Sequence, residues 1–272
     1  MGMGVVIVVL LIVLAVVLIK KKDASMPISF DLTTEVFGQT VEEEALTADG
    51  LAADLCVGAG DTALDGVETQ GDERAALFDI QNKTLLFSKS LYEKSYPASI
   101  TKIMTAYLAI KNGDLNSTIT MSDAAVWGID RNSSHIALDV GEEISMSDAL
   151  YAVMLMSANE AAWAIAEQVS GSLENFVQLM NDTAQSLGCK DTHFTNANGL
   201  HDPDHYTTAY DLYLIFQADI ASQTFRDIIS QAAYTCNVTG SSGVRTLTWT
   251  STNYYAQGKA AAPAGVHVIG GK

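Results

Sequence analysis

Two side chains three positions apart, Ser99 and Lys102, have the chemistry of a nucleophile and a base in this 272-residue chain. They follow Pro97 at the start of a stretch whose apolar residues recur at helical spacing, and residues i and i+3 lie on one face of a helix. The helix dipole favours negative charge that develops on a hydroxyl in the first turn. Burial disfavours the ammonium form of a lysine, so a neutral Lys102 could accept the proton of Ser99. The pair predicts a serine nucleophile with a lysine general base, although this spacing by itself is common.

A second polar element, Ser-Ala-Asn at residues 157–159, lies in a predicted break between two helical stretches. The hydroxyl of Ser157 could relay a proton between Lys102 and a leaving amine. The amide of Asn159 could orient either the substrate backbone or Lys102. Serine and asparagine are ordinary residues at helix breaks, so this element carries weight only together with the first.

A third element, Val-Ile-Gly-Gly-Lys at residues 268–272, contains the last lysine of the sequence, Lys272. A lysine on a strand beside an active site would bind a substrate carboxylate. The two glycines before it would let a substrate backbone approach closely.

In this order, the three elements resemble the SxxK, SxN and KTG motifs of penicillin-binding proteins and serine β-lactamases. Longer strings at residues 96–105, 193–201 and 205–212 are similar to segments of the serine D-alanyl-D-alanine carboxypeptidases. The resemblance covers about residues 74–272. The Thr-Gly of the third motif does not follow Lys272, and we therefore expect a catalytic domain truncated at its C-terminus.

The resemblance implies a role for each residue. Ser99 would be the acylated nucleophile and Lys102 its general base, while Ser157 and Asn159 would shuttle protons and position the substrate. Lys272 would hold the terminal carboxylate. The implied activity is removal of the terminal D-Ala from peptidoglycan stem peptides that end in D-Ala-D-Ala, through an acyl-serine intermediate. β-Lactam antibiotics would inhibit it, and no cofactor or metal is implied.

Two other functions stay open as alternatives. A class A β-lactamase needs a glutamate after the SxN motif to activate the deacylating water, but no glutamate occurs after Glu174. A non-catalytic, membrane-tethered module that binds penicillin or peptidoglycan would have no need to keep all four polar residues of the first two motifs. Both alternatives are therefore less well supported than the carboxypeptidase.

The N-terminal part divides into an expected membrane segment at residues 1–22 and an acidic leader or spacer at residues 23–73. The apolar run from Val5 to Ile19 ends at three lysines, and extended back to residue 1 it would form about 28 Å of helix. A cleaved signal peptide would have small residues where the lysines stand, so we expect an uncleaved anchor. Lysines on this side favour a cytoplasmic location for the residues after the anchor. The resemblance implies the opposite, a catalytic domain (74–272) on the outside of the cell membrane.

The net charge of -17 argues against nucleic acid as a partner, because the chain could not neutralise a phosphate backbone. The three cysteines have no zinc-ligand spacing, and we expect buried thiols or at most one disulfide. Three histidines and two aspartates lie close together in sequence and invite a metal interpretation, but their surroundings are typical of turns. We expect loop hydrogen bonding from this group, which comprises His193, His201, Asp202, Asp204 and His205.

Alternation and helical spacing predict the elements that position these residues. A hairpin is expected at residues 75–88, and strands again from Tyr234 onward. Between them, helices are expected at about 100–112, 147–156, 160–169, 173–187, 207–220 and 224–229. The expected fold class is α/β, with an antiparallel sheet of about five strands flanked by helices, as in penicillin-binding proteins and serine β-lactamases. Its strands would come from distant parts of the chain.

Overall fold

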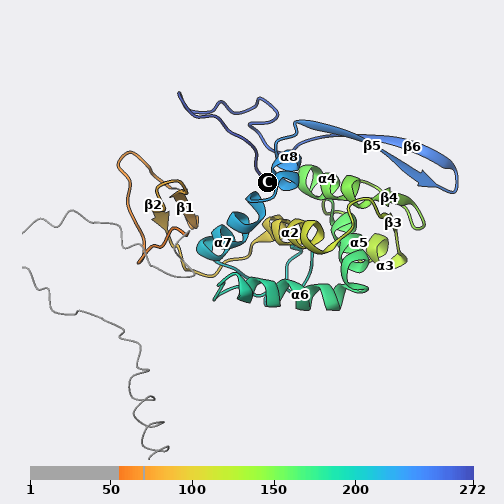
Figure 1. Ribbon diagram of the computed structural model, residues 1–272, viewed down its shortest axis with the longest axis horizontal. Helices are drawn as coiled ribbons and strands as arrows, with labels where there is room; N and C mark the ends of the chain where they lie inside the picture. The colour runs from red at the N-terminus through yellow and green to blue at the C-terminus, as the bar shows by residue number, and fades with distance from the viewer. Residues whose placement is uncertain (1–54, 70) are drawn as a thin grey trace, which may run out of the picture. The chain divides into compact units, whose positions relative to one another are not determined.

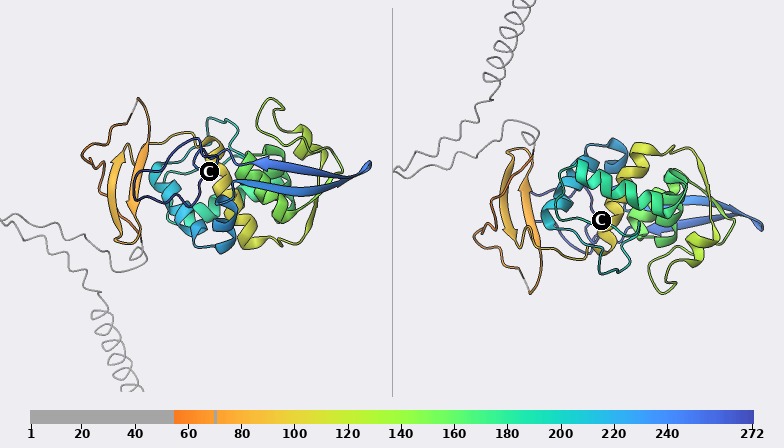
Figure 2. Two further views of the ribbon diagram at one scale, coloured as in Figure 1. Left: turned by 90° about the horizontal axis from the view of Figure 1, so that it is seen from above. Right: turned by 90° about the horizontal axis from the view of Figure 1, so that it is seen from below.

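The computed structural model describes residues 55–69 and 71–272 of the chain (Figures 1 and 2). Within these ranges, no helix is both long enough and apolar enough to span a membrane. The predicted anchor at residues 1–22 lies outside the described residues, as does most of the acidic leader.

The helices form where the apolar spacing predicts them. Five of them begin after a serine or threonine whose side-chain oxygen accepts a backbone N–H from the first turn, which satisfies one donor that the helix leaves unpaired. These capping residues are Ser122, Ser145, Ser172, Thr208 and Ser222. The described helices are η1 (Ala98–Thr101), α2 (Lys102–Asn112), α3 (Asp123–Trp127), α4 (Met146–Met156), α5 (Asn159–Ser170), α6 (Leu173–Ser186), α7 (Ala209–Ile220) and α8 (Gln223–Ile229).

The strands form two antiparallel sheets. One is the predicted hairpin of β1 (Ala75–Asp79) and β2 (Thr84–Lys89). The other has the order β3-β4-β5-β6, with the short strands β3 (Thr118–Thr120) and β4 (Glu143–Ser145) beside the long hairpin of β5 (Ala233–Gly240) and β6 (Gly243–Thr250). The two hairpins lie at opposite ends of the helical part in all views (Figures 1 and 2).

The α/β class with antiparallel sheets is confirmed, but the expected single sheet of about five strands is wrong for the described residues. The strand predicted to begin near His267 is also absent, because residues 266–272 make no ladder with another segment. A strand needs a partner for its backbone N–H and C=O groups. Without a bridging strand, the β1–β2 and β5–β6 hairpins remain in separate sheets.

The core lies between helices α2, α4, α5 and α6. Helix α5 buries four alanines, and their small side chains let neighbouring helices approach closely. Larger side chains such as Leu108, Leu150, Ile165 and Phe176 fill the space between these helices and are fully buried. Tight packing of this kind holds the ends of α2, α4 and α5 in fixed positions.

The end of the predicted acidic leader packs against the helical unit before residue 74. The backbone N–H of Cys56 donates to the Tyr213 hydroxyl (2.8 Å), and its C=O accepts from the Tyr210 hydroxyl (3.0 Å). Thr62 exchanges two backbone hydrogen bonds with Ser88 of β2. These contacts show that residues 55–62 belong to the helical unit and do not form a free spacer. The acidic composition of this stretch gave no sign of them.

Candidate active site

Ser99 and Lys102 lie where a tight turn runs into a helix. Ser99 belongs to the 3-10 turn η1, and Lys102 is the first residue of α2. The Lys102 Nζ atom lies 3.4 Å from the Ser99 Oγ atom. Ser99 is half-buried and Lys102 is fully buried. The nucleophile is thus open to a substrate, while its predicted base is shielded from water.

Two other oxygen atoms contact the Lys102 amine. It donates to Asn159 Oδ1 at 2.7 Å and to the main-chain carbonyl of Asn198. The pKa of Lys102 is lowered to about 7, mainly because the amine is buried and also because of the positive charge of Lys272, while the negative charge of Glu160 opposes both effects. A substantial fraction of Lys102 is therefore neutral at neutral pH and can act as a base.

The break between α4 and α5 is confirmed, and it brings Asn159 to the amine. Ser157 ends α4 in the left-handed conformation (φ 60°), and Asn159 then begins α5. The Asn159 side chain donates to Ser133 Oγ at 2.7 Å, so its amide is held from both sides. Ser157 Oγ is buried and has no hydrogen-bond partner among the described residues. It is available for the predicted proton relay, a role that stays a prediction.

The loop at residues 193–205 packs against the turn that carries Ser99. His205 is buried and bonds through Nε2 to Thr101 Oγ1 (2.7 Å), while its Nδ1 accepts the backbone N–H of Thr195 (3.0 Å). Burial lowers the pKa of His205 to about 4, so the ring is neutral and its Nε2–H donates to Thr101. Loop hydrogen bonding was expected for this histidine. It holds Thr101, which lies directly before Lys102, in place.

Gly199 makes the closest approach in this loop. Its φ of +81° lies in the left-handed region, and a Cβ atom there would lie 1.8 Å from the carbonyl oxygen of Ala98. Only glycine fits this position. The fit brings the neighbouring carbonyl of Asn198 onto Lys102.

Lys272 lies close enough for its charge to act on Lys102. Its own burial lowers its pKa to about 8. Before it, the Cα of Gly270 lies against the backbone of Ile229, where a Cβ would come within 2.4 Å of the Ile229 carbonyl oxygen. The structure thus gathers all of Ser99, Lys102, Asn159 and Lys272 at one place, although Lys272 is not on the predicted strand.

Comparison with known proteins identifies the family of this chain. Residues 66–266 match the model of the peptidase S11 family, D-alanyl-D-alanine carboxypeptidase. The chain belongs to this family. The match begins eight residues before the start at residue 74 that the sequence motifs indicated, in agreement with the packing of the preceding segment.

Individual members of the family are similar over part of the chain. The carboxypeptidase DacA of Haemophilus influenzae is 38% identical over 147 residues, which are 51% of this chain and 37% of that protein. The DacF carboxypeptidase of Bacillus subtilis is 38% identical over 144 residues (52% and 37%). The chain therefore spans less than half the length of these two relatives. The D-alanyl-D-alanine carboxypeptidase of Streptomyces strain K15 is 32% identical over 181 residues, 62% of either chain.

A solved structure supports the same conclusion about the fold. The crystal structure of the Streptomyces K15 DD-transpeptidase superimposes with a TM-score of 0.61 at 30% sequence identity. The superposition covers 65% of this chain and 71% of that one. The resemblance to the carboxypeptidase family that the motifs suggested is thereby confirmed.

Several residues of this family member's site were not identified from the sequence. They are the Asn198 carbonyl, the hydroxyl of Ser133 and the buried carboxylate of Glu160. A main-chain carbonyl has no sequence signature. Ser133 contacts the Asn159 side chain, and Glu160 follows Asn159 in α5. One feature of the sequence indicated them, a glutamate among the alanines of α5.

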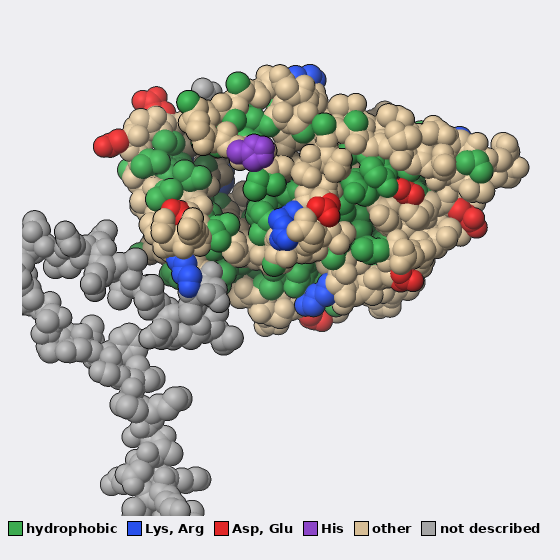
Figure 3. All heavy atoms as spheres, turned by 45° about the horizontal axis from the view of Figure 1, so that its top comes forward, with side chains coloured by type: hydrophobic (Ala, Val, Ile, Leu, Met, Phe, Trp, Pro, Cys, Tyr) green, Lys and Arg blue, Asp and Glu red, His purple; other side chains and the backbone are tan. Residues whose placement is uncertain are grey.

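The remaining polar candidates have structural partners. His193 bonds through Nδ1 to the Asp204 carbonyl (2.6 Å). In the part of the chain that the structure describes, no group of three or more His, Cys, Asp or Glu side chains is arranged to hold a metal ion. The three cysteines, all within the described ranges, are free thiols. On the face drawn in Figure 3, Lys and Arg side chains stand apart and form no basic patch.

Proposed function

We propose that the protein is a serine D-Ala-D-Ala carboxypeptidase that removes the terminal D-Ala of peptidoglycan stem peptides. The observation that carries this proposal is the half-buried Ser99 with a buried Lys102 amine 3.4 Å from its hydroxyl. The pKa of that amine is about 7, which suits a general base at neutral pH. Membership in the carboxypeptidase family supports the substrate class.

In the first half of the reaction, Ser99 Oγ attacks the carbonyl carbon of the penultimate D-Ala while its proton passes to Lys102 Nζ. The backbone N–H of Ser99 would stabilise the resulting oxyanion. The C–N bond to the terminal D-Ala then breaks. The leaving amine takes its proton from Lys102, relayed by the unpartnered hydroxyl of Ser157.

In the second half, water attacks the carbonyl carbon of the acyl-serine ester and loses a proton to Lys102. The C–O bond to Ser99 then breaks, Ser99 Oγ takes the proton from Lys102, and the shortened peptide is released. Asn159 keeps the lysine in place throughout, because its amide is fixed between Lys102 and Ser133. The ammonium of Lys272 would pair with the carboxylate of the terminal D-Ala. Penicillin would acylate Ser99 in the same way, because its β-lactam amide also presents a carbonyl carbon and a leaving nitrogen. Attack by Ser99 would open the ring.

A β-lactamase remains the alternative within the same fold. No glutamate follows Glu174 in this sequence, and Glu174 is an exposed residue at the start of α6. The deacylating water of a class A β-lactamase would thus have no glutamate from this region to activate it. This favours a long-lived penicilloyl adduct over rapid hydrolysis.

We further propose that residues 1–22 anchor the protein in the cell membrane, with the catalytic unit on the outer side. The apolar run of these residues and the location of peptidoglycan support this arrangement. Protease protection of the protein in intact cells and in lysed cells would distinguish the two orientations.

The test of the enzymatic proposal is labelling with a fluorescent penicillin. The full-length protein should form a covalent adduct, and mass spectrometry should place it on the peptide that contains Ser99. The Ser99→Ala variant should not be labelled, whereas Ser95→Ala, a change four residues before the nucleophile, should be. Labelling of another residue, or unchanged labelling of Ser99→Ala, would contradict the proposal and favour a non-catalytic binding module.

A further inference from the structure

Glu160 is a buried carboxylate beside the proposed site that the proposed mechanism does not use. It directly follows Asn159 in the first turn of α5, and its exposed fraction is 0%. Its Oε1 atom accepts the backbone N–H of Ile136 at 2.7 Å. Its Oε2 atom is buried and has no hydrogen-bond partner among the described residues. Burial of a carboxylate with so few partners costs free energy, which suggests that this side chain has a task.

The hydrogen bond to Ile136 holds a loop that in turn holds Asn159. In this loop, Ser133 Oγ accepts from the Asn159 amide (2.7 Å), and the Ser134 carbonyl accepts the Asn159 backbone N–H (2.9 Å). The other side of the amide contacts Lys102. Glu160 therefore acts on the predicted base through the loop and through Asn159.

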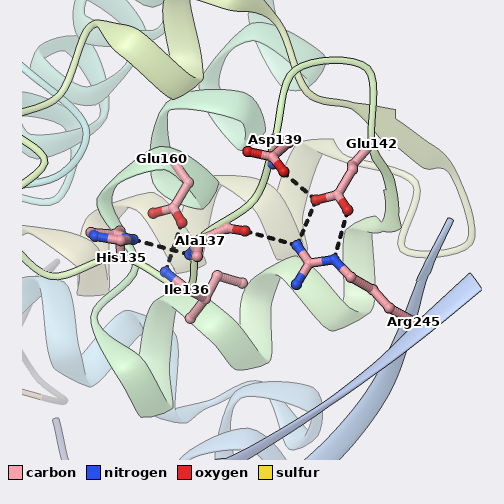
Figure 4. A network of polar contacts seen from close by, with 7 residues as sticks. All are labelled: His135, Ile136, Ala137, Asp139, Glu142, Glu160 and Arg245. Carbon is pink, nitrogen blue, oxygen red and sulfur yellow. Dashed lines mark hydrogen bonds and ion pairs between the residues drawn. The ribbon is translucent and has the colours of Figure 1, made fainter. Parts of the chain in front are cut away.

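The far end of the same loop is clamped to the β5–β6 hairpin. Arg245 of β6 binds both carboxylate oxygens of Glu142 at 2.6 Å, and it also donates to the Ala137 carbonyl at 2.8 Å. The backbone N–H of Asp139 donates to Glu142 as well. Figure 4 shows that Glu160 and the Arg245 clamp approach the loop from different sides. Because both ends of the loop are fixed, loss of the Glu160 hydrogen bond should displace the part of the loop that contacts Asn159.

The charge of Glu160 also reaches Lys102. Among the described residues, two charged groups influence the pKa of Lys102: Lys272 lowers it and Glu160 raises it. His205, which bonds to the neighbouring Thr101, is neutral above pH 5 because burial lowers its pKa to about 4.

We propose that Glu160 is a positioning residue for the acylation step, which fixes the 133–142 loop behind Asn159 and supplies a negative charge that acts on Lys102. This inference rests on the proposed function. The Glu160 side chain makes two contributions to acylation. The hydrogen bond to Ile136 sets the geometry, and the charge sets the pH at which Lys102 becomes a base.

The experiment measures the second-order rate of acylation by penicillin at pH 6 and pH 8 in the full-length protein. Glu160→Gln keeps an acceptor for the Ile136 N–H but removes the charge. Lys102 then loses its proton at lower pH, so the ratio of the rate at pH 6 to the rate at pH 8 should rise about threefold to tenfold. The rate at pH 8 should fall by no more than about fivefold. A purely structural role would lower both rates by the same factor.

Two further variants complete the test. Glu174→Gln removes the same charge from an exposed site on α6 and should leave the ratio unchanged. Glu160→Asp keeps the charge on a shorter side chain, so its rates should fall at both pH values while the ratio stays that of the wild type. This variant also serves if Glu160→Gln does not fold, because a raised ratio in Glu160→Asp would overturn the proposal.

The outcomes distinguish this inference from the proposed function. If penicillin does not acylate Ser99 in the wild-type protein, the proposed function fails. If Ser99 is acylated but Glu160→Gln has the pH ratio of the wild type, the proposed function stands and the role of Glu160 is refuted.

Discussion

The contacts of the Lys102 amine allow it to act as a base when it is neutral. A neutral amine has two N–H donors and one lone pair. Asn159 Oδ1 and the Asn198 carbonyl can accept only, and they lie closer to Nζ than Ser99 Oγ does. With the two donors directed at these oxygens, the lone pair is left for the hydroxyl of Ser99. In this neutral form, the hydroxyl donates to the amine, which is the direction that proton transfer requires; in the ammonium form, the amine donates to the hydroxyl.

A substitution of Lys102 by arginine should therefore be nearly as damaging as a substitution by alanine. Arginine keeps the positive charge but does not lose its proton in a protein, so it has no lone pair for Ser99. We expect both variants to be acylated by penicillin about 10²–10⁴ times more slowly than the wild type. Stopped-flow measurement of acylation would test this.

The control is Lys111→Arg, because Lys111 lies at the exposed end of the same helix. It should be acylated at the wild-type rate. Near-normal acylation of the Lys102→Arg variant would refute Lys102 as the general base.

At the level of single residues, sequence spacing predicted three polar side chains that the structure brings into contact, Ser99, Lys102 and Asn159. Ser99 and Lys102 share a helical face, and Asn159 follows a helix break, and these are local properties. The partners that tune them come from elsewhere in the chain. Asn198 and His205 are distant in sequence, and the loop that carries them was interpreted only as a series of turns.

At the level of elements, the same distinction between local and distant determinants applies. Helices α4 to α8 lie within two residues of their predicted bounds, because an apolar face and, in all of them except α5, a capping serine or threonine are encoded locally. Strands β3 and β4 have three residues each; the mixed, polar stretch at residues 116–145 predicted short strands there, but neither their bounds nor their partners. So short a strand has no alternation to detect, and its existence depends on pairing with a distant segment.

The contact between the 193–205 loop and the nucleophile turn can be tested through Gly199. An alanine there would meet the Ala98 carbonyl at 1.8 Å and would keep a positive φ. We expect Gly199→Ala to lower the free energy of unfolding by about 2–5 kcal/mol, from the backbone conformation and the clash together. Acylation of Ser99 should slow at least about tenfold, because displacement of the adjacent Ala98 misplaces the nucleophile.

Gly171 provides a matched control, since its φ is +79° and its added Cβ would have no neighbour within 4 Å. The variant Gly171→Ala should lose only the conformational part, about 1–2 kcal/mol, and should be acylated normally. Urea denaturation and acylation rates measure both quantities. Equal losses of stability in the two variants would show that the loop and the turn are not in tight contact.

At the level of the whole molecule, the buried acid Asp219 is a site where stability depends on pH. It lies near the end of α7 and is fully buried. Neither of its carboxylate oxygens has a hydrogen-bond partner among the described residues. Burial raises the pKa of this carboxyl to about 8. In the folded protein, Asp219 is therefore protonated at neutral pH.

This carboxyl should make the folded protein less stable as the pH rises. The unfolded chain releases the Asp219 proton near its ordinary pKa of about 4, whereas the folded chain keeps it up to about pH 8. Between these values the folded state binds more protons, so the free energy of unfolding falls with increasing pH. In Asp219→Asn, which cannot ionise, this contribution is absent. Relative to the wild type, the variant should gain about 2–4 kcal/mol between pH 5 and pH 8.

Urea denaturation of both proteins at pH 5 and pH 8 measures this gain as a difference of differences. An asparagine amide is also a buried polar group, so Asp219→Asn is expected to be no more stable than the wild type at pH 5, and only the change with pH carries the argument. Asp182→Asn is the control, because Asp182 is exposed on α6 and its substitution should leave the pH dependence unaltered. If the difference in free energy of unfolding between Asp219→Asn and the wild type were the same at both pH values, the carboxyl would have to be ionised in the folded state. A cation or hydrogen-bond donor would then have to reach it.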